Sequence, residues 1–390
     1  MTSSRADYGH LYWPVKELLA RPDVSLSLIA LGPHLSPAFG HTVDEIEGDG
    51  FTVAERVECL LSSDTDVGMA KTIGIAAMSL ADTLGRTRPD LLLLIADRYE
   101  MLAPASVALA LRIPVAHIEG GEISEGAIDD AVRNALTKMS HIHLTTTESA
   151  RLRVLAMGEE AWRVRRVGSP SLDHLRRRAL MPREALEADL RIKLKQSTVV
   201  VTYHPVTMAH DTNFEADAVF AALEQLPQQI IFCYPNADAG SHALIKRVRV
   251  FCQSRPHAHL FVNLNHLKYW SLLACADLFV GNSSSGIMET PSLGLPTVNI
   301  GVRQQGRERA RNVLDAAPSV ASILENARRG LSPAFRASLA GMTNPYGDGR
   351  ASERIAEILT GVRLGEKLLM KRAVPLEGNT WRHDETAGGV

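Results

Sequence analysis

Short apolar runs alternate with longer amphipathic stretches along the first half of the chain. The runs predict strands at residues 25–31, 91–96, 113–118, 141–145 and 164–167. The run at 91–96 is apolar at every position, which is typical of a parallel strand buried on both faces. The stretches between the runs predict helices at 67–86, 101–111, 129–138 and 148–157.

The alternation restarts in the second half. Residues 172–195 are dense in Arg, Glu and Lys and carry no strand pattern, so they predict a helical link. Beyond the link, strands are predicted at 198–203, 229–234, 259–262, 277–280 and 296–300. Two successive series of strands and helices predict two doubly wound α/β domains with a cleft between them.

These patterns suggest the domain boundaries. Residues 1–175 are expected to form the first domain and residues 176–348 the second. A last helical pattern at 351–360 lies within a C-terminal helical segment, 349–365. The periodicity ends there, so we expect residues 366–390 to form a disordered tail.

The composition excludes several classes of partner. The chain has 390 residues, of which 42 are basic and 44 acidic, giving a net charge of −2. This balance offers no electrostatic footprint for nucleic acid or an anionic membrane. No apolar run approaches the ~20 residues of a membrane span, and the N-terminus carries no apolar signal segment. The four cysteines are widely spread with no C-x-x-C spacing, so we expect free thiols, a cytoplasmic location and no metal site.

Four common site motifs are absent from the sequence. There is no G-x-G-x-x-G after a strand, no G-x-x-x-x-G-K-[ST], no H-E-x-x-H and no G-x-S-x-G. NAD binding, P-loop chemistry, this type of zinc protease and the α/β-hydrolase elbow are therefore not indicated. We expect no cofactor.

Polar residues follow the predicted strands, at the position where open α/β sheets bind ligands. The segment G-N-S-S-S-G at 281–286 combines small residues, three hydroxyls and a helix start. Such a segment can hold a diphosphate without a lysine, with Arg303 one strand away as a cationic clamp. The alternative is a serine-rich helix cap, although a cap needs only one hydroxyl.

Three carboxylates in the first half are candidates for proton transfer: Asp97, Glu119 and Asp129. Like charges brought together in a cleft raise the pKa of at least one member toward neutrality. Each also has a structural alternative, namely a pair with Arg98 or a helix cap for Asp97, a solvated turn for Glu119, and a helix-dipole partner for Asp129.

Histidines extend the list of candidates. His204 precedes Pro205 at a strand exit and can serve as a general acid or base, or as a phosphate donor. His141 and His143 alternate on one strand, so both rings face the same side. Two core or cleft histidines are favoured over a metal pair because no third ligand is evident.

Ten stretches spread over both halves carry a family resemblance. In these stretches the sequence resembles the hydrolysing UDP-N-acetylglucosamine 2-epimerases of sialic acid and related nonulosonic acid biosynthesis, from residue 4 to about residue 358. They are S-R-A-D-Y-G (4–9), A-D-R-Y-E (96–100), H-I-E-G-G-E (117–122), I-D-D-A-V-R (128–133), T-K-M-S-H-I-H (137–143), H-P-V-T (204–207), P-N-A-D-A-G-S (235–241), G-N-S-S-S-G-I-M-E (281–289), V-N-I-G-V-R-Q-Q-G-R (298–307) and Y-G-D-G (346–349).

The resemblance implies two Rossmann-like domains in a glycosyltransferase-B-like architecture, with a nucleotide sugar in the interdomain cleft. It implies a C-terminal helix that crosses back to the first domain. UDP would be held mainly by the second domain, and Arg5 would approach the diphosphate. The implied substrate-binding residues are Arg5, Arg98, Asn236, Asn282, Ser283, Ser284, Glu289 and Arg303, and the implied catalytic residues are Asp97, Glu119, Asp129 and His204.

The implied reaction eliminates UDP to give a 2-acetamidoglycal, which is then hydrated to free N-acetylmannosamine. Such a reaction needs a base for the weakly acidic C2 proton and an acid that returns a proton on the opposite face. The residues leave open which carboxylate is which. They also leave open UDP-N,N′-diacetylbacillosamine or a GDP-sugar as substrate, a glycosyltransferase of the same fold, a nucleotide-sugar sensor and a non-hydrolysing epimerase. A homodimer or homotetramer is expected.

The sequence departs from the family at two positions. Asn134 follows Arg133 where many relatives carry histidine, and Ala96 precedes Asp97 where relatives often carry glycine. A third difference concerns the start of the chain, since residues 3–9 are loop-like and only two residues precede them. Either the natural protein is longer or the first sheet has a gap between neighbouring strands. Since a gap would leave backbone groups unpaired at about 1–3 kcal/mol each, we expect a natural protein that is longer by about 5–10 residues, roughly one strand.

Overall fold

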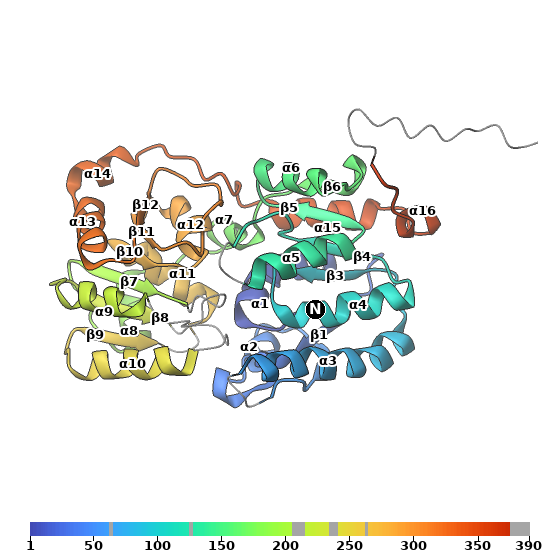
Figure 1. Cartoon of the computed structure of the whole chain (residues 1–390), viewed down its shortest axis with the longest axis horizontal. Helices are drawn as coiled ribbons and strands as arrows, with labels where there is room; N and C mark the ends of the chain where they lie inside the picture. Colours follow the sequence, from blue (N-terminus) through green and yellow to red (C-terminus); the bar gives the residue numbers. More distant parts are fainter. Residues whose placement is uncertain (62–64, 125–127, 205–214, 234–240, 262–263, 375–390) are drawn as a thin grey trace, which may run out of the picture.

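The computed structural model describes residues 1–61, 65–124, 128–204, 215–233, 241–261 and 264–374. Figure 1 shows two lobes side by side, each built on parallel strands covered by helices. The first lobe contains the first half of the chain together with its C-terminal helices, and the second contains the remainder.

The first lobe holds a four-stranded parallel sheet and a separate parallel pair. The four strands lie in the order β3 (Leu92–Ile95), β4 (Val115–Ile118), β5 (Ile142–Thr145) and β6 (Val164–Arg166), and the pair consists of β1 (Leu28–Leu31) and β2 (Val53–Val57). All residues of β1, β4 and β5 are buried, as expected for strands with helices on both faces.

The second lobe holds a six-stranded parallel sheet. Its strands lie in the order β12 (Val313–Ala316), β11 (Thr297–Ile300), β10 (Leu278–Gly281), β7 (Thr198–Thr202), β8 (Gln229–Cys233) and β9 (Ala258–Phe261). The strand order reverses between β10 and β7, which is the position where doubly wound sheets open a ligand crevice.

Sixteen helices are found in the described part of the chain. They are α1 (Arg5–Leu19), α2 (Val43–Gly48), α3 (Asp66–Thr87), α4 (Leu102–Leu111), α5 (Ile128–Met139), α6 (Glu148–Ala156), α7 (Asp173–Arg177), α8 (Arg183–Leu190), α9 (Ala216–Glu224), α10 (Ser241–Gln253), α11 (His266–Cys275), α12 (Ser285–Met288), α13 (Val320–Leu331), α14 (Pro333–Ser338), α15 (Ala351–Gly361) and α16 (Glu366–Leu369). Short 3₁₀ turns lie at Gly32–Leu35, Pro37–Phe39, Tyr99–Met101, Ala161–Arg163, Pro170–Leu172 and Thr290–Leu293.

The expectation of a loop at residues 3–9 is wrong, because α1 already begins at Arg5. Ser4 caps this helix by accepting a hydrogen bond from the backbone N–H of Asp7, which fits the preference of serine for helix starts. The Asp7 carboxylate in turn accepts from the hydroxyl of Ser3 at 2.7 Å. The segment is therefore the capped start of a helix.

The first sheet has a gap, since β1 and β3 are not directly paired. Thr2 occupies the intervening space, where its backbone N–H donates to Ile29 at 3.1 Å and its carbonyl accepts from Leu31 at 3.0 Å. On the other side, the ammonium group of Met1 donates to the carbonyl of Leu93 at 3.0 Å. Two residues thus satisfy part of the backbone hydrogen bonding between the strands.

The expectation that residues 366–390 form a disordered tail is wrong for the described stretch up to residue 374. Helix α16 lies on the first lobe, where the buried guanidinium of Arg163 donates to the carbonyls of Lys367, Leu368 and Met370. Helix α15 also returns to this lobe and packs its Ile355 into the core around Tyr8 of α1. Residues 375–390 lie outside the described residues.

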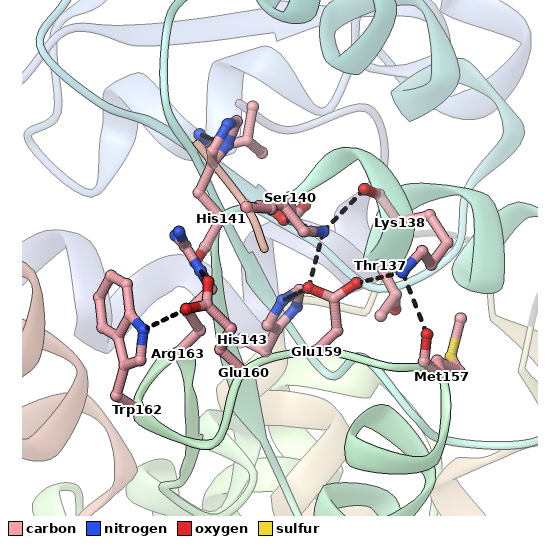
Figure 2. A network of polar contacts seen from close by, with 12 residues as sticks. Thr137, Lys138, Ser140, His141, His143, Met157, Glu159, Glu160, Trp162 and Arg163 are labelled. Atoms are coloured by element: carbon pink, nitrogen blue, oxygen red, sulfur yellow. Dashed lines mark hydrogen bonds and ion pairs between the residues drawn. The ribbon is translucent and has the colours of Figure 1, made fainter. Parts of the chain in front are cut away.

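A buried polar network fixes the chain beyond α16, and Figure 2 shows its centre. The enclosed carboxylate of Glu159 contacts Lys138 at 2.6 Å, Lys371 at 2.7 Å and His143 at 3.1 Å. His141 accepts a hydrogen bond from the backbone N–H of Val115 at 3.1 Å. Both histidines are thus core residues with protein partners.

Two further findings concern the whole described chain. Cys59, Cys233, Cys252 and Cys275 are free thiols, as expected. In the ranges given above, no helix combines the length and apolar character that crossing a membrane requires.

Candidate active site

One large cleft lies between the two lobes and encloses about 1380 Å³, including space open to solvent. It is lined by the ends of parallel strands in both lobes and by the start of α1. Most of the expected site residues line it: Arg5, Asp97, Arg98, Glu119, Asp129, His204, Ser283, Ser284, Glu289 and Arg303.

Asp97 follows β3, at a turn where the preceding Ala96 has a φ of 56°. This left-handed conformation favours glycine, which is consistent with the residue often found in relatives at this position. Asp97 forms an ion pair with the buried Arg133 of α5, and not with its neighbour Arg98. Arg133 also donates to the hydroxyl of Ser124 at 3.3 Å, so the arginine is held from two sides.

Arg98 instead pairs with Glu100, with contacts of 3.2 and 3.1 Å between the guanidinium and the two carboxylate oxygens. Burial raises the pKa of Glu100 above its ordinary value, although Arg98 opposes that shift. Arg98 reaches the cleft but is already tied to a buried acid.

Glu119 follows β4 and has a φ of 67°. Its Oε1 atom lies 2.7 Å from Nδ1 of His10 on α1 and accepts from the hydroxyl of Ser169 at 3.1 Å. Burial alone would raise the pKa of Glu119, but His10 and Arg307 outweigh it and hold the pKa below its ordinary value. In the same way, the desolvation of His10 is outweighed by Glu119 and Glu289, and the pKa of His10 rises to about 9.

Asp129, in the first turn of α5, forms an ion pair across the cleft with Arg303 of the second lobe at 3.1 Å. Arg303 also donates to the carbonyl of Asn282 at 3.3 Å. Because Arg303 lies directly beside the 281–286 segment, it is placed to bind an anion held there.

His204 follows β7 and is positioned by Asn282. The Asn282 side chain accepts from the backbone N–H of His204 at 2.7 Å and donates to its carbonyl at 2.8 Å. The Asn282 side chain therefore holds the strand exit in place, and its expected part in substrate binding stays a prediction.

The serine segment forms a tight turn between β10 and α12. Gly281 has a φ of 151°, and a Cβ atom there would lie 2.0 Å from the carbonyl oxygen of Thr202. The hydroxyl of Ser285 donates to Glu289 and contacts the hydroxyl of Tyr269 at 2.8 Å. Ser283 and Ser284 line the cleft beside it, so the segment fits the expected anion cradle.

Sequence reasoning missed several polar residues of the cleft, above all His10. It comes directly after the S-R-A-D-Y-G stretch and lies three residues beyond Asp7, one helical turn away, a spacing that would have placed it on the cleft face of a helix.

Arg307 was also missed, although it ends a matching stretch. Its guanidinium crosses between the lobes to the carbonyl of Ile123 at 2.5 Å and the hydroxyl of Ser124 at 3.0 Å. Asn236 was expected in the site and lies outside the described residues.

Three residues of types that can bind a metal ion lie close together near the cleft. Among the described residues, Glu45, Asp49 and His266 bring three potential ligand atoms within 4.8 Å of one another. Arg178 contacts Nε2 of His266 at 2.8 Å, and a guanidinium can only donate. Nε2 therefore accepts, and the neutral ring carries its proton on Nδ1, which lies 3.7 Å from Oε1 of Glu45. A protonated nitrogen cannot bind a metal ion, so this tautomer argues against a metal site.

Comparison with known proteins identifies the family of the chain. A family model described as UDP-N-acetylglucosamine 2-epimerase matches residues 16–360. The chain belongs to this family. Membership also agrees with the placement of the motif residues around one cleft.

Three relatives match between 81% and 96% of the chain. The GDP/UDP-N,N′-diacetylbacillosamine 2-epimerase (hydrolyzing) of Campylobacter jejuni is 37% identical over 319 residues, which cover 81% of this chain and 83% of that protein. The UDP-N,N′-diacetylbacillosamine 2-epimerase (hydrolyzing) of Legionella pneumophila is 35% identical over 373 residues, 95% of this chain and 97% of that protein. The UDP-N-acetylglucosamine 2-epimerase of Neisseria meningitidis is 31% identical over 384 residues, 96% of this chain and 98% of that protein.

Solved structures of epimerases share the fold. The UDP-GlcNAc 2-epimerase from Neisseria meningitidis bound to UDP-GlcNAc matches with a TM-score of 0.78 and 18% identity, covering 92% of this chain and 98% of that one. The enzyme from Methanocaldococcus jannaschii in complex with UDP-GlcNAc and UDP matches with a TM-score of 0.75 and 18% identity, covering 92% and 98%. The expected glycosyltransferase-B-like architecture is thus confirmed.

Proposed function

We propose that this epimerase converts a UDP-linked 2-acetamido sugar into the free C2-epimeric sugar and UDP. The reaction proceeds by elimination of UDP to a 2-acetamidoglycal, followed by hydration of the double bond. The observation that carries the proposal is the arrangement of the cleft, in which acids of the first lobe face an anion cradle on the second.

The first half of the reaction removes a very weakly acidic proton from C2. Asp97 and Asp129 supply carboxylates for this step, and each is held in position by an arginine, Arg133 and Arg303 respectively. The leaving diphosphate carries the electron pair of the broken C1–O bond. Donors already in place at Ser283, Ser284 and Arg303 stabilise that charge without reorganising, which is how preorganised sites lower a barrier.

The second half adds water at C1 and a proton at C2. Return of the proton on the opposite face inverts C2, so a second acid is required. The cleft provides Glu119 with its partner His10, and His204 at the end of β7.

UDP-N,N′-diacetylbacillosamine is the first candidate substrate, because the relatives from Campylobacter jejuni and Legionella pneumophila carry that sugar in their names. UDP-N-acetylglucosamine, which gives N-acetylmannosamine, is the second candidate and is supported by the Neisseria meningitidis relative. A GDP-linked diacetamido sugar belongs in the same comparison, since the name of the Campylobacter jejuni protein includes it.

The test is a product assay on these three nucleotide sugars in deuterated water, followed by NMR. We expect free sugar with inverted C2, one deuterium at C2 and one equivalent of nucleoside diphosphate. A product that keeps the C2 proton would refute proton abstraction, and an epimer still linked to UDP would identify a non-hydrolysing enzyme. The homodimer or homotetramer stays a prediction, which light scattering on the purified protein measures.

A further inference from the structure

His10 and Glu119 both line the cleft, and the imidazole is the more exposed member of the pair. The side chain of His10 is 20% exposed and that of Glu119 only 7%. Oε1 of Glu119 lies 2.7 Å from Nδ1 of His10 and accepts a hydrogen bond from the hydroxyl of Ser169 at 3.1 Å. The imidazole is therefore the more accessible of the two groups, while the carboxylate is engaged by His10 and Ser169.

The surroundings of His10 favour its charged form. Its second nitrogen, Nε2, lies 3.7 Å from the carboxylate of Glu289 on the other lobe. Asp7, one turn earlier on α1, adds a third negative group. Burial of His10 opposes protonation, but the acids outweigh it. The nearby His174 adds no positive charge at neutral pH, because burial lowers its pKa to about 3. An imidazole between these acids carries a proton at neutral pH, in line with its pKa of about 9.

The other two candidate acids have the opposite kind of partner. Asp97 faces Arg133, and Asp129 faces Arg303. An arginine next to a carboxylate favours the ionised form, which accepts a proton. The cleft thus combines two carboxylates whose partners favour the ionised form with an imidazole whose partners favour the protonated form, and such a difference indicates acid and base roles.

We propose that His10 is the acid that returns a proton to C2 of the glycal, and that Glu119 is a positioning residue that orients the His10 ring. The proton on Nε2 is transferred to C2, and the electron pair of the C1=C2 bond forms the new C2–H bond. Water then adds its oxygen to the cationic C1, and its surplus proton passes to Asp97 or Asp129. His10 regains a proton from solvent before the next cycle. This inference rests on the proposed function, because it assigns a step of that reaction.

The substitution His10→Asn separates the two functions of the ring. Asparagine places an amide N–H near the position of Nδ1, so it can still donate to Glu119, but it carries no titratable proton. We expect UDP release to continue while the product changes from free 2-epimer to glycal, with formation of the epimer reduced about 100-fold. Binding of UDP should stay within about twofold of the native protein, because Ser284 and Arg303 are untouched.

His41→Asn is the matched control. Its Nδ1 also contacts a carboxylate, that of Asp44 at 2.9 Å, but the pair is exposed and lies outside the cleft lining. This variant should make free epimer at the native rate. If His10→Asn made free epimer at the native rate, or hydrated added glycal as fast as the native protein, the assignment of His10 would be overturned. Failure of the native protein to release any free sugar would instead overturn the proposed function and the step assigned here with it.

Two measurements separate this role from a structural one. Since the acid must be protonated, turnover of the native protein should fall as the pH rises through about 9. In Glu119→Gln, turnover should fall at a lower pH, because the carboxylate that stabilises the charged ring is gone. NMR titration of the His10 ring in the full chain measures the pKa of this ring directly, without substrate. A His10 ring that titrates below pH 7 in the native protein, or at the same pH in Glu119→Gln, would contradict the proposal.

Discussion

Replacement of Glu159 by glutamine tests the buried network that ties the C-terminal segment to the first lobe (Figure 2). The carboxylate is fully enclosed and accepts from His143, Lys138 and Lys371. Burial alone would raise the pKa of Glu159, but these three donors outweigh it and lower the pKa from 4.5 to about 2.

The size of the effect follows from that shift. The pKa of Glu159 falls from 4.5 to about 2 on folding, and each pKa unit corresponds to about 1.36 kcal/mol. The ionised form therefore stabilises the fold by about 3 kcal/mol. Removing one partner of a buried pair costs about 3–5 kcal/mol in general. Lys138 is half exposed and can return to water, so we expect Glu159→Gln to cost about 2–3 kcal/mol. For a domain of this size, that lowers the melting temperature by about 4–12 °C.

The pH dependence has a definite sign. Because the pKa of Glu159 is lower in the folded state, its contribution is complete above about pH 4.5 and is lost as the pH falls toward 2. Thermal unfolding at pH 7 and pH 3 should therefore show the native protein and the variant converging at the lower pH. Glu148→Gln, which breaks an exposed pair with Arg151, is the control and should leave the melting temperature unchanged. A variant as stable as the native protein at pH 7, or a difference that does not change with pH, would refute the argument.

Three further substitutions probe the cleft. Asp97→Asn should lower turnover by at least about 100-fold with little change in UDP affinity, measured by steady-state kinetics and calorimetry; near-normal turnover would remove Asp97 from the catalytic set. Gly281→Ala should abolish UDP binding, because its Cβ would lie 2.0 Å from the carbonyl oxygen of Thr202 and force β10 away from β7; an unchanged UDP affinity would show that the turn is not required. Ala96→Gly should stabilise the fold by up to about 1 kcal/mol, since glycine adopts the φ of 56° at lower cost, and denaturant unfolding measures it. A loss of stability would mean that the methyl group contributes more than the backbone strain costs.

The strands that the sequence predicts well are those buried on both faces. Strand β3 is apolar throughout, and β7 and β10 each contain three consecutive apolar residues; such runs indicate a buried strand. The strands that were missed, β2 and β12, lie at sheet edges and carry charged residues such as Glu55 and Asp315. Edge strands are defined by their pairing partners, which sequence patterns do not show.

The sequence could predict which residues lie near the site, but not which of them pair with one another. Ends of neighbouring parallel strands meet at one edge of a sheet, so Asp97 and Glu119 could be placed together in advance. The partner of Asp97 could not, because Arg133 is 36 residues away on a helix whose rotation depends on packing. His10 and Asn282 show the same limit, since the contacts of each are made with residues more than 70 positions distant.

The backbone at the two strand ends supports a functional interpretation of the acids. Ala96 and Glu119 both adopt left-handed conformations, each of which costs a residue with a side chain about 1–2 kcal/mol. The strain is held by the sheet itself, because the N–H of Ala96 donates to Ile118 at 3.0 Å and that of Glu119 donates to Leu144 at 2.9 Å. His117 adds a hydrogen bond to the carbonyl of Ala96 at 2.7 Å. Two adjacent strands thus end in the same strained turn, and each turn places a carboxylate in one cleft. Relaxed turns would serve folding at lower cost. The strain is therefore better explained by the demands of the site than by those of folding.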